Sequence, residues 1–115
     1  MQKLAQPEQS LNEIYEAAHG THLVGRMYHM YYDDMVRYLG EPSVSQESGD
    51  GKTQVEWVFK FKDQVFTIYD WKTYDRDYTL QELTQWNIGG TSKHRLEFFE
   101  ELENIIKKPV KIGMP

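Results

Sequence analysis

The segment Ile88-Gly-Gly-Thr-Ser-Lys-His-Arg95 combines residue types that can bind an anion. Consecutive glycines let a backbone turn so that its N–H groups converge, and the N-terminus of a following helix presents unpaired donors and positive potential. The segment predicts an anion-binding site, whose candidate residues are Gly89, Gly90, Thr91, Ser92, Lys93 and Lys72. The spacing is not that of a P-loop, and an ordinary strand-to-helix turn capped by Thr91 or Ser92 explains the same residues.

A second set of residues resembles the metal site of a nuclease. Glu56, Asp70 and Lys72 are of the types that hold Mg²⁺ and orient a water molecule in such enzymes. In the expected hairpin, Asp70 and Lys72 share one face while Glu56 lies on the other, so the three converge only if the strand carries a bulge. A buried carboxylate needs hydrogen bonds or a cation. We therefore expect Asp70 to be a structural residue that anchors the following loop, and we assign no catalytic residue and no metal ligand.

Aromatic residues, at 14% of the chain, exceed what a core of this size requires. Tyrosine and tryptophan anchor interfaces because they bury a large area with few rotors and keep a polar tip. The candidate partner-binding residues are Tyr69, Trp71, Tyr74 and Trp86. Half-buried packing explains them equally well. With acidic charges nearby, such a surface suits a basic protein partner or a homo-oligomer.

These residues depend on a hairpin at about 53–72, in which apolar and polar residues alternate. We expect its turn at Asp63-Gln64, so that Phe61 pairs with Phe66. One face then forms the core, and its residues are Val55, Trp57, Phe59, Phe61, Phe66 and Ile68. The other face is amphipathic and suits partial exposure; its residues are Glu56, Val58, Lys60, Thr67, Tyr69 and Trp71.

The remaining pattern predicts three short helices and two more strands. Helices are expected at about 10–19, at about 31–39 and after Thr91 or Ser92, where Leu96, Phe99 and Leu102 recur at helical spacing. Strands are expected over 21–28 and over 83–88, where Gly89-Gly90 ends the second strand. The fold class is α+β, a small antiparallel sheet around the hairpin with three short helices packed largely on one face.

Six phrases occur in order along residues 20–106: Gly20-Thr-His-Leu-Val-Gly25, Tyr32-Asp-Asp-Met-Val36, Leu39-Gly-Glu-Pro42, Gly51-Lys-Thr-Gln-Val-Glu-Trp57, Thr67-Ile-Tyr-Asp-Trp-Lys72 and Trp86-Asn-Ile-Gly-Gly90. In combination they resemble a group of small, mostly uncharacterised proteins of tailed bacteriophages. Asp63-Gln64 departs from the Asp-Gly turn expected there. The resemblance implies an origin and a fold more than a chemistry, and a viral origin favours a protein that binds and neutralises a host component.

Composition bounds the remaining possibilities. At 115 residues with 39% hydrophobic residues, we expect a single domain over 1–115, with a core at about 10–106 and flexible terminal tails. The absence of cysteine excludes disulfides and thiolate metal sites. A net charge of −5 disfavours nucleic-acid binding. With no long apolar run and no apolar signal region, we expect a protein of the bacterial cytoplasm without membrane contact.

The leading hypothesis is a phage-encoded, non-enzymatic binding protein that needs no cofactor. It would neutralise a host or defence component, either by occluding a protein or by sequestering a small anionic ligand. The alternatives are a metal-dependent nuclease that uses Asp70, Lys72 and Glu56, and a component of the virion or its assembly.

Overall fold

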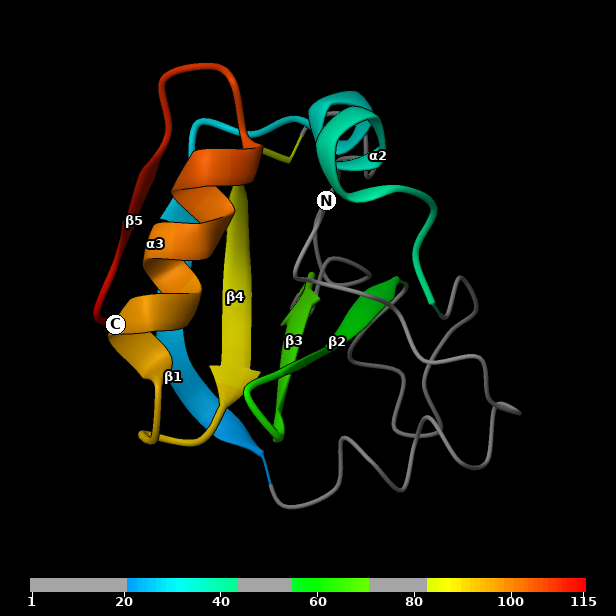
Figure 1. Ribbon diagram of the computed structural model, residues 1–115. Coiled ribbons are helices and arrows are strands. Elements are labelled where there is room, and N and C mark those ends of the chain that lie inside the picture. The colour runs from blue at the N-terminus through cyan, green and yellow to red at the C-terminus, as the bar shows by residue number, and fades with distance from the viewer. Residues whose placement is uncertain (1–20, 44–54, 71–82) are drawn as a thin grey trace.

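The computed structural model describes residues 21–43, 55–70 and 83–115 (Figure 1). This part of the chain forms five strands and two helices, which confirms the α+β class. The helix expected at about 10–19 lies outside the described residues. In chain order the elements are β1 (His22–Tyr28), α2 (Tyr32–Leu39), β2 (Glu56–Phe61), β3 (Gln64–Tyr69), β4 (Gln85–Gly90), α3 (Arg95–Ile105) and β5 (Lys111–Gly113).

The strands form one antiparallel sheet in the order β2-β3-β4-β1-β5. The β2–β3 hairpin therefore lies at one edge, and β4 is the middle strand. The strand expected over 21–28 and the helix expected at about 31–39 are confirmed by β1 and α2.

The hairpin turn differs from the expected one. Lys62 and Asp63 occupy it with φ angles of 49° and 63°, so Phe61 pairs with Gln64 and Phe59 pairs with Phe66. A two-residue turn with positive φ at both positions matches the twist of the flanking strands. Moving the turn by one residue moves the pairing by two, so the expected pairs were wrong. The expected division into two faces is confirmed for the paired residues of the two strands, while Trp71 lies outside the described residues.

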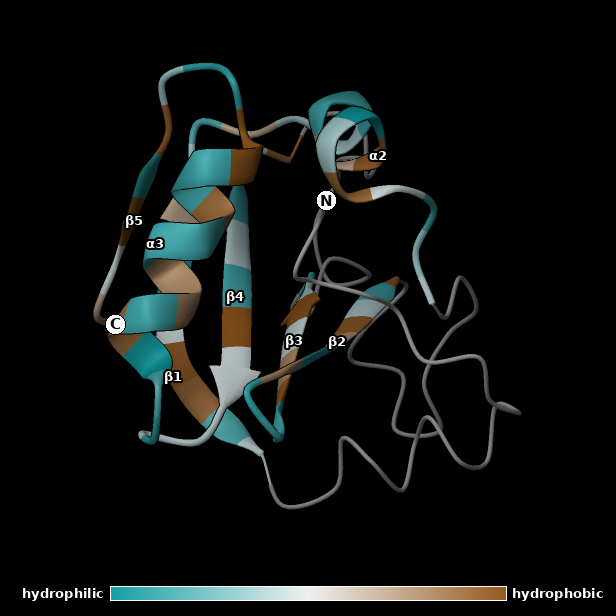
Figure 2. Cartoon of the chain, viewed as in Figure 1, coloured by the Kyte–Doolittle hydropathy of each residue, from teal (hydrophilic) through white to brown (hydrophobic). Residues whose placement is uncertain are grey.

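The face of the sheet that carries the core is covered by α2 and α3. Phe98 of α3 stacks on Phe66 of β3 with ring centroids 4.2 Å apart and planes 7° apart. Phe59 and Phe61 of β2 also contact the Phe98 ring. Hydrophobic residues of α3 face the sheet while its outward side is mainly hydrophilic (Figure 2). The rings of β2 and β3 therefore form one aromatic core with α3.

Two tryptophans attach α2 to the same face. The Trp86 indole donates to the Met30 carbonyl before α2, at 2.8 Å, and the Trp57 indole donates to the Gly40 carbonyl after it, at 2.8 Å. The two indole rings meet edge to face, 5.6 Å apart at 85°. Both ends of α2 are thus hydrogen-bonded to side chains of the sheet.

The junction between β4 and α3 corrects three expectations. Gly89 and Gly90 belong to β4 and do not end it. His94, with a φ of 62°, precedes α3, so neither Thr91 nor Ser92 caps the helix. Because α3 turns Phe98 and Phe99 toward the sheet, Leu96 lies on its outward side and is 68% exposed.

Packing accounts for the glycine at the end of β4. A Cβ atom on Gly90 would lie 2.5 Å from the Phe66 ring, whereas a Cβ atom on Gly113 would meet nothing within 4 Å. The Phe66 ring is itself stacked on Phe98 and has no room to move away. Gly90 therefore lets the backbone of β4 lie close to the Phe66 ring.

We predict that Gly90→Ala destabilises the protein by about 1–3 kcal/mol, because the added methyl group overpacks the core. Urea unfolding followed by tryptophan fluorescence measures the change. Gly113→Ala is the matched control and should lie within about 0.5 kcal/mol of the unmodified protein. Equal stability of the two variants would refute this account of Gly90.

Candidate functional site

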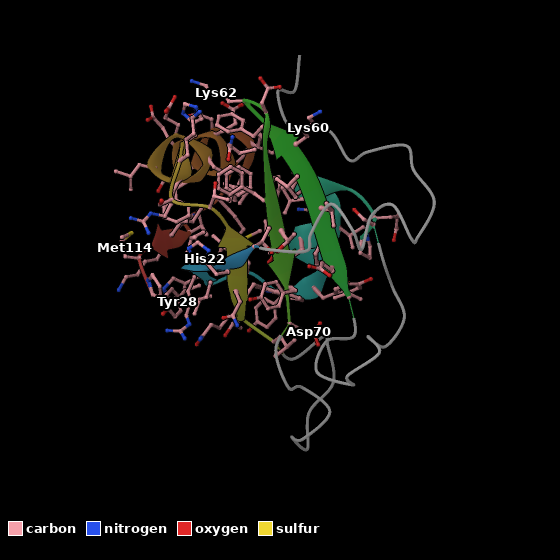
Figure 3. All side chains as sticks on the ribbon, turned by 90° about the horizontal axis from the view of Figure 1, so that it is seen from below. His22, Tyr28, Lys60, Lys62, Asp70 and Met114 are labelled. Atoms are coloured by element: carbon pink, nitrogen blue, oxygen red, sulfur yellow. The ribbon has the colours of Figure 1, made fainter. Side chains whose placement is uncertain are left out.

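The side of the sheet opposite α2 and α3, here called the second face, carries most of the polar side chains of the inner strands. Its residues are Arg26 of β1, Glu56, Val58 and Lys60 of β2, Val65, Thr67 and Tyr69 of β3, and Asn87 and Gly89 of β4. Lys60 lies near the turn of the hairpin, and Asp70 lies at the hairpin's opposite end (Figure 3).

Four polar side chains line up across this face. Glu56 pairs with Tyr69, Tyr69 with Asn87, and Asn87 with Arg26, so the four stand side by side on β2, β3, β4 and β1. We call these four residues the polar row. Each is only partly exposed. Residues directly opposite each other on antiparallel strands have neighbouring Cβ atoms, so each side chain lies beside the next.

Hydrogen bonds connect the β1 half of the polar row. The Arg26 Nε atom donates to the Asn87 Oδ1 atom at 3.4 Å. Burial raises the pKa of the Tyr69 phenol, and Glu56 acts in the same direction, while Arg26 and a hydrogen bond with Asn87 act against them. Tyr69 is therefore a neutral phenol at physiological pH, between Asn87 on one side and the Glu56 carboxyl group on the other.

Glu56 is the residue of this face whose pKa is shifted furthest from its ordinary value. Burial raises its pKa from the ordinary 4.5 to about 7; the Thr67 hydroxyl acts to lower the pKa, and the charge of Asp70 acts to raise it. The carboxyl group therefore exchanges its proton near neutral pH. A perturbed carboxyl group among polar neighbours is typical of functional sites, although structural networks also produce it.

Thr67 lies beside the polar row and carries a buried hydroxyl group. The residue is 1% exposed, and within the described ranges its Oγ1 atom has no partner with hydrogen-bonding geometry. The hydroxyl group is close enough to Glu56 to affect the carboxyl pKa, so it faces that group without an aligned hydrogen bond. An unsatisfied buried hydroxyl costs about 1–3 kcal/mol, so its presence calls for an explanation.

Gly89 makes room for these side chains. A Cβ atom on Gly89 would lie 2.6 Å from the Thr67 Oγ1 atom and 3.3 Å from the Tyr69 ring. Both side chains of β3 therefore lean over the bare backbone of β4. Gly89 was predicted to bind an anion at a turn, but in the structure it is a strand residue that leaves space for side chains of the second face.

The candidate partner-binding residues separate in the structure. Tyr69 lies in the polar row and is partly exposed. Trp86 lies in the core at 1% exposure, with its indole N–H bound to Met30, so it is not a surface anchor. Trp71 and Tyr74 lie outside the described residues.

The predicted anion site is divided in a similar way. Gly89 and Gly90 are strand residues, while Thr91, Ser92 and Lys93 form the turn before α3. The Thr91 hydroxyl donates to the Gln64 side chain at 2.9 Å. Lys72 lies outside the described residues.

A carboxylate of the protein itself, that of Glu97, lies at the first turn of α3, where an anion was predicted to bind. The Glu97 carboxylate contacts the Lys62 ammonium group, and it is 2.7 Å from the His94 Nδ1 atom. The Lys62 contact, followed by that of His94, lowers the pKa of Glu97. Since a carboxylate is stabilised at a helix N-terminus, Glu97 supplies the negative charge that this position favours.

Asp70 has a structural contact. It is 1% exposed, and its Oδ1 atom accepts a hydrogen bond from the Val55 N–H at 2.9 Å. It therefore holds the segment that leads into β2. The register also places it on the face opposite Glu56, as the sequence predicts. Among the residues that the structure describes, no three His, Asp or Glu side chains are grouped to hold a metal ion.

Sequence reasoning missed three residues of this site, which are Arg26, Thr67 as a buried hydroxyl, and Asn87. Only Asn87 could have been found from the sequence, because it is a polar residue between Trp86 and Ile88, two core residues of one strand. Such a residue must point to the opposite face. Which residues stand beside it depends on strand order and register, and the local pattern does not contain them.

No protein-family model, curated protein or solved structure matches this chain. Within the described ranges, neither helix is long and apolar enough to cross a membrane.

We predict that the stability of the protein falls as the pH rises from about 4.5 to about 7, through the ionisation of Glu56. The folded-state pKa lies above the unfolded value, so folding favours the protonated acid, and its contribution is lost as the pH passes the folded pKa. Glu56→Gln should be up to about 3 kcal/mol more stable than the unmodified protein at pH 8 and nearly equal to it at pH 4.

Urea unfolding across this pH range tests the prediction. Glu103→Gln on the exposed side of α3 is the control and should keep the pH dependence of the unmodified chain. An unchanged pH dependence in Glu56→Gln would show that Glu56 does not titrate as described.

Proposed function

We propose that this chain is a non-enzymatic binding protein that holds its partner against the second face of the sheet. The observation that carries the proposal is the polar row, in which Arg26, Asn87, Tyr69 and Glu56 stand side by side across four strands. A row of partly buried donors and acceptors offers both specific hydrogen bonds and a desolvated setting that strengthens them.

The distribution of the helices supports this choice of face. The core face is filled by the aromatic rings that α2 and α3 press against the sheet. The polar row lies on the other face, and its four residues retain partial exposure. A partner that contacts the sheet at this row would add no strain to the core.

The resemblance to bacteriophage proteins suggests what the partner is. In this proposal the chain is phage-encoded and acts in the host cytoplasm on a host or defence component. It would either occlude a protein or sequester a small anionic ligand, and both forms use the same face. Of the predicted anchors, Tyr69 is the one that lies in the polar row.

Tyr69→Phe tests the proposal because it removes one hydroxyl group and keeps the ring that packs over Gly89. We expect binding to weaken about five-fold, the value of one neutral hydrogen bond near 1 kcal/mol. The fraction of partner-bound protein in native mass spectra, after gentle purification from a bacterial lysate, gives the comparison.

Tyr31→Phe is the matched control, since Tyr31 is 52% exposed just before α2 and lies apart from the second face. It should retain the partner fully. An equal loss in both variants, or none in Tyr69→Phe, would contradict the use of this face.

A further inference from the structure

Arg26 is a partly buried cation that has no carboxylate partner among the described residues. In the described part of the chain, the cations that form ion pairs are Lys62, His94 and Lys108; Arg26 is among the cations that do not, as is Arg95, whose Nε atom is buried without an aligned partner. Within the described residues, the Arg26 Nε atom donates a hydrogen bond to the Asn87 Oδ1 atom at 3.4 Å. A guanidinium group has five N–H donors, so most of its donors remain available.

The surroundings of Arg26 favour a ligand over bulk water as the missing partner. Asn87 binds Nε and thereby orients the planar group, which leaves the terminal nitrogens for a second contact. The neutral Tyr69 phenol lies on β3, on the other side of Asn87 from Arg26. The Thr67 hydroxyl, which has no aligned partner among the described residues, lies two residues from Tyr69 along the same face of β3. A fixed guanidinium group beside neutral donors matches the oxygens of a carboxylate or phosphate.

We propose that Arg26, oriented by Asn87, binds an anionic oxygen group, carboxylate or phosphate, on the partner that the second face holds. This inference rests on the proposed function and specifies the chemistry of its site. Arg26 supplies the positive charge, and Tyr69 supplies a hydrogen bond near it.

Glu56 limits how strongly this site attracts an anion. It lies at the far end of the polar row, on the other side of Tyr69 from Arg26. The titratable groups that interact with Glu56 are Asp70 and Tyr69 of the β3 segment. When Glu56 is ionised, its negative charge opposes the bound anion, so its neutral isostere should favour binding.

The test is an NMR titration of the ¹⁵N-labelled full chain at pH 8 with inorganic phosphate and, separately, with acetate. We expect saturable shifts of the Arg26 side-chain Nε–H and the Asn87 side-chain amide. The anion that saturates at the lower concentration tells whether the group is a phosphate or a carboxylate. If neither anion shifts these signals, the inference is overturned.

Three variants make the test specific. Arg26→Gln should weaken anion binding by about ten-fold or more, the value of a charge-assisted hydrogen bond, while Arg37→Gln on the exposed side of α2 should leave binding unchanged. Glu56→Gln should tighten it. Equal weakening by both arginine variants, which would indicate a general charge effect, overturns the inference.

The outcomes also separate this inference from the proposed function. Suppose that Tyr69→Phe loses the partner but the Arg26 NMR signals do not shift with phosphate or acetate. The second face is then still the binding surface, and the partner's group is not anionic. If the anions bind at Arg26 but Tyr69→Phe retains the partner fully, the anion site stands and the proposed function fails.

Discussion

The antiparallel pairing of β3 with β4 is the constraint on which both sides of this molecule depend. It joins the hairpin to the rest of the sheet by setting Ile68 opposite Ile88 on the core face and Tyr69 opposite Asn87 on the second face. Because side chains alternate along a strand, a shift of one residue would exchange the two faces. The aromatic core and the polar row are therefore two consequences of a single register.

Glycine in β4 makes this pairing compact. Gly90 leaves space for the Phe66 ring on the core face, and Gly89 leaves space for Thr67 and Tyr69 on the second face. Two neighbouring residues without side chains thus let β3 lean over β4 from both sides. Their importance lies in packing, since both have ordinary strand conformations.

The two faces differ in how their polar groups are satisfied. On the core face, the indole N–H groups of Trp57 and Trp86 have carbonyl acceptors at 2.8 Å. On the second face, Thr67 has no aligned partner and Arg26 has no counter-ion among the described residues. Folded proteins seldom leave buried polar groups unsatisfied without a reason. An unaligned donor also occurs on the core side, at the buried Arg95 Nε atom of α3, so it is the grouping of Thr67, Arg26 and their polar neighbours that marks the second face as the candidate binding side.

The order of amino acids by itself determined the α+β class, the hairpin, the helix around Met35 and the division of the hairpin into two faces, because alternation and helical spacing are local. It did not determine the hairpin register, the phase of α3 or the burial of Trp86. Those depend on the positive φ angles of Lys62 and Asp63 and on contacts between distant segments. The polar row was decided by tertiary structure alone, since its members come from four strands and only the register of the sheet places them side by side.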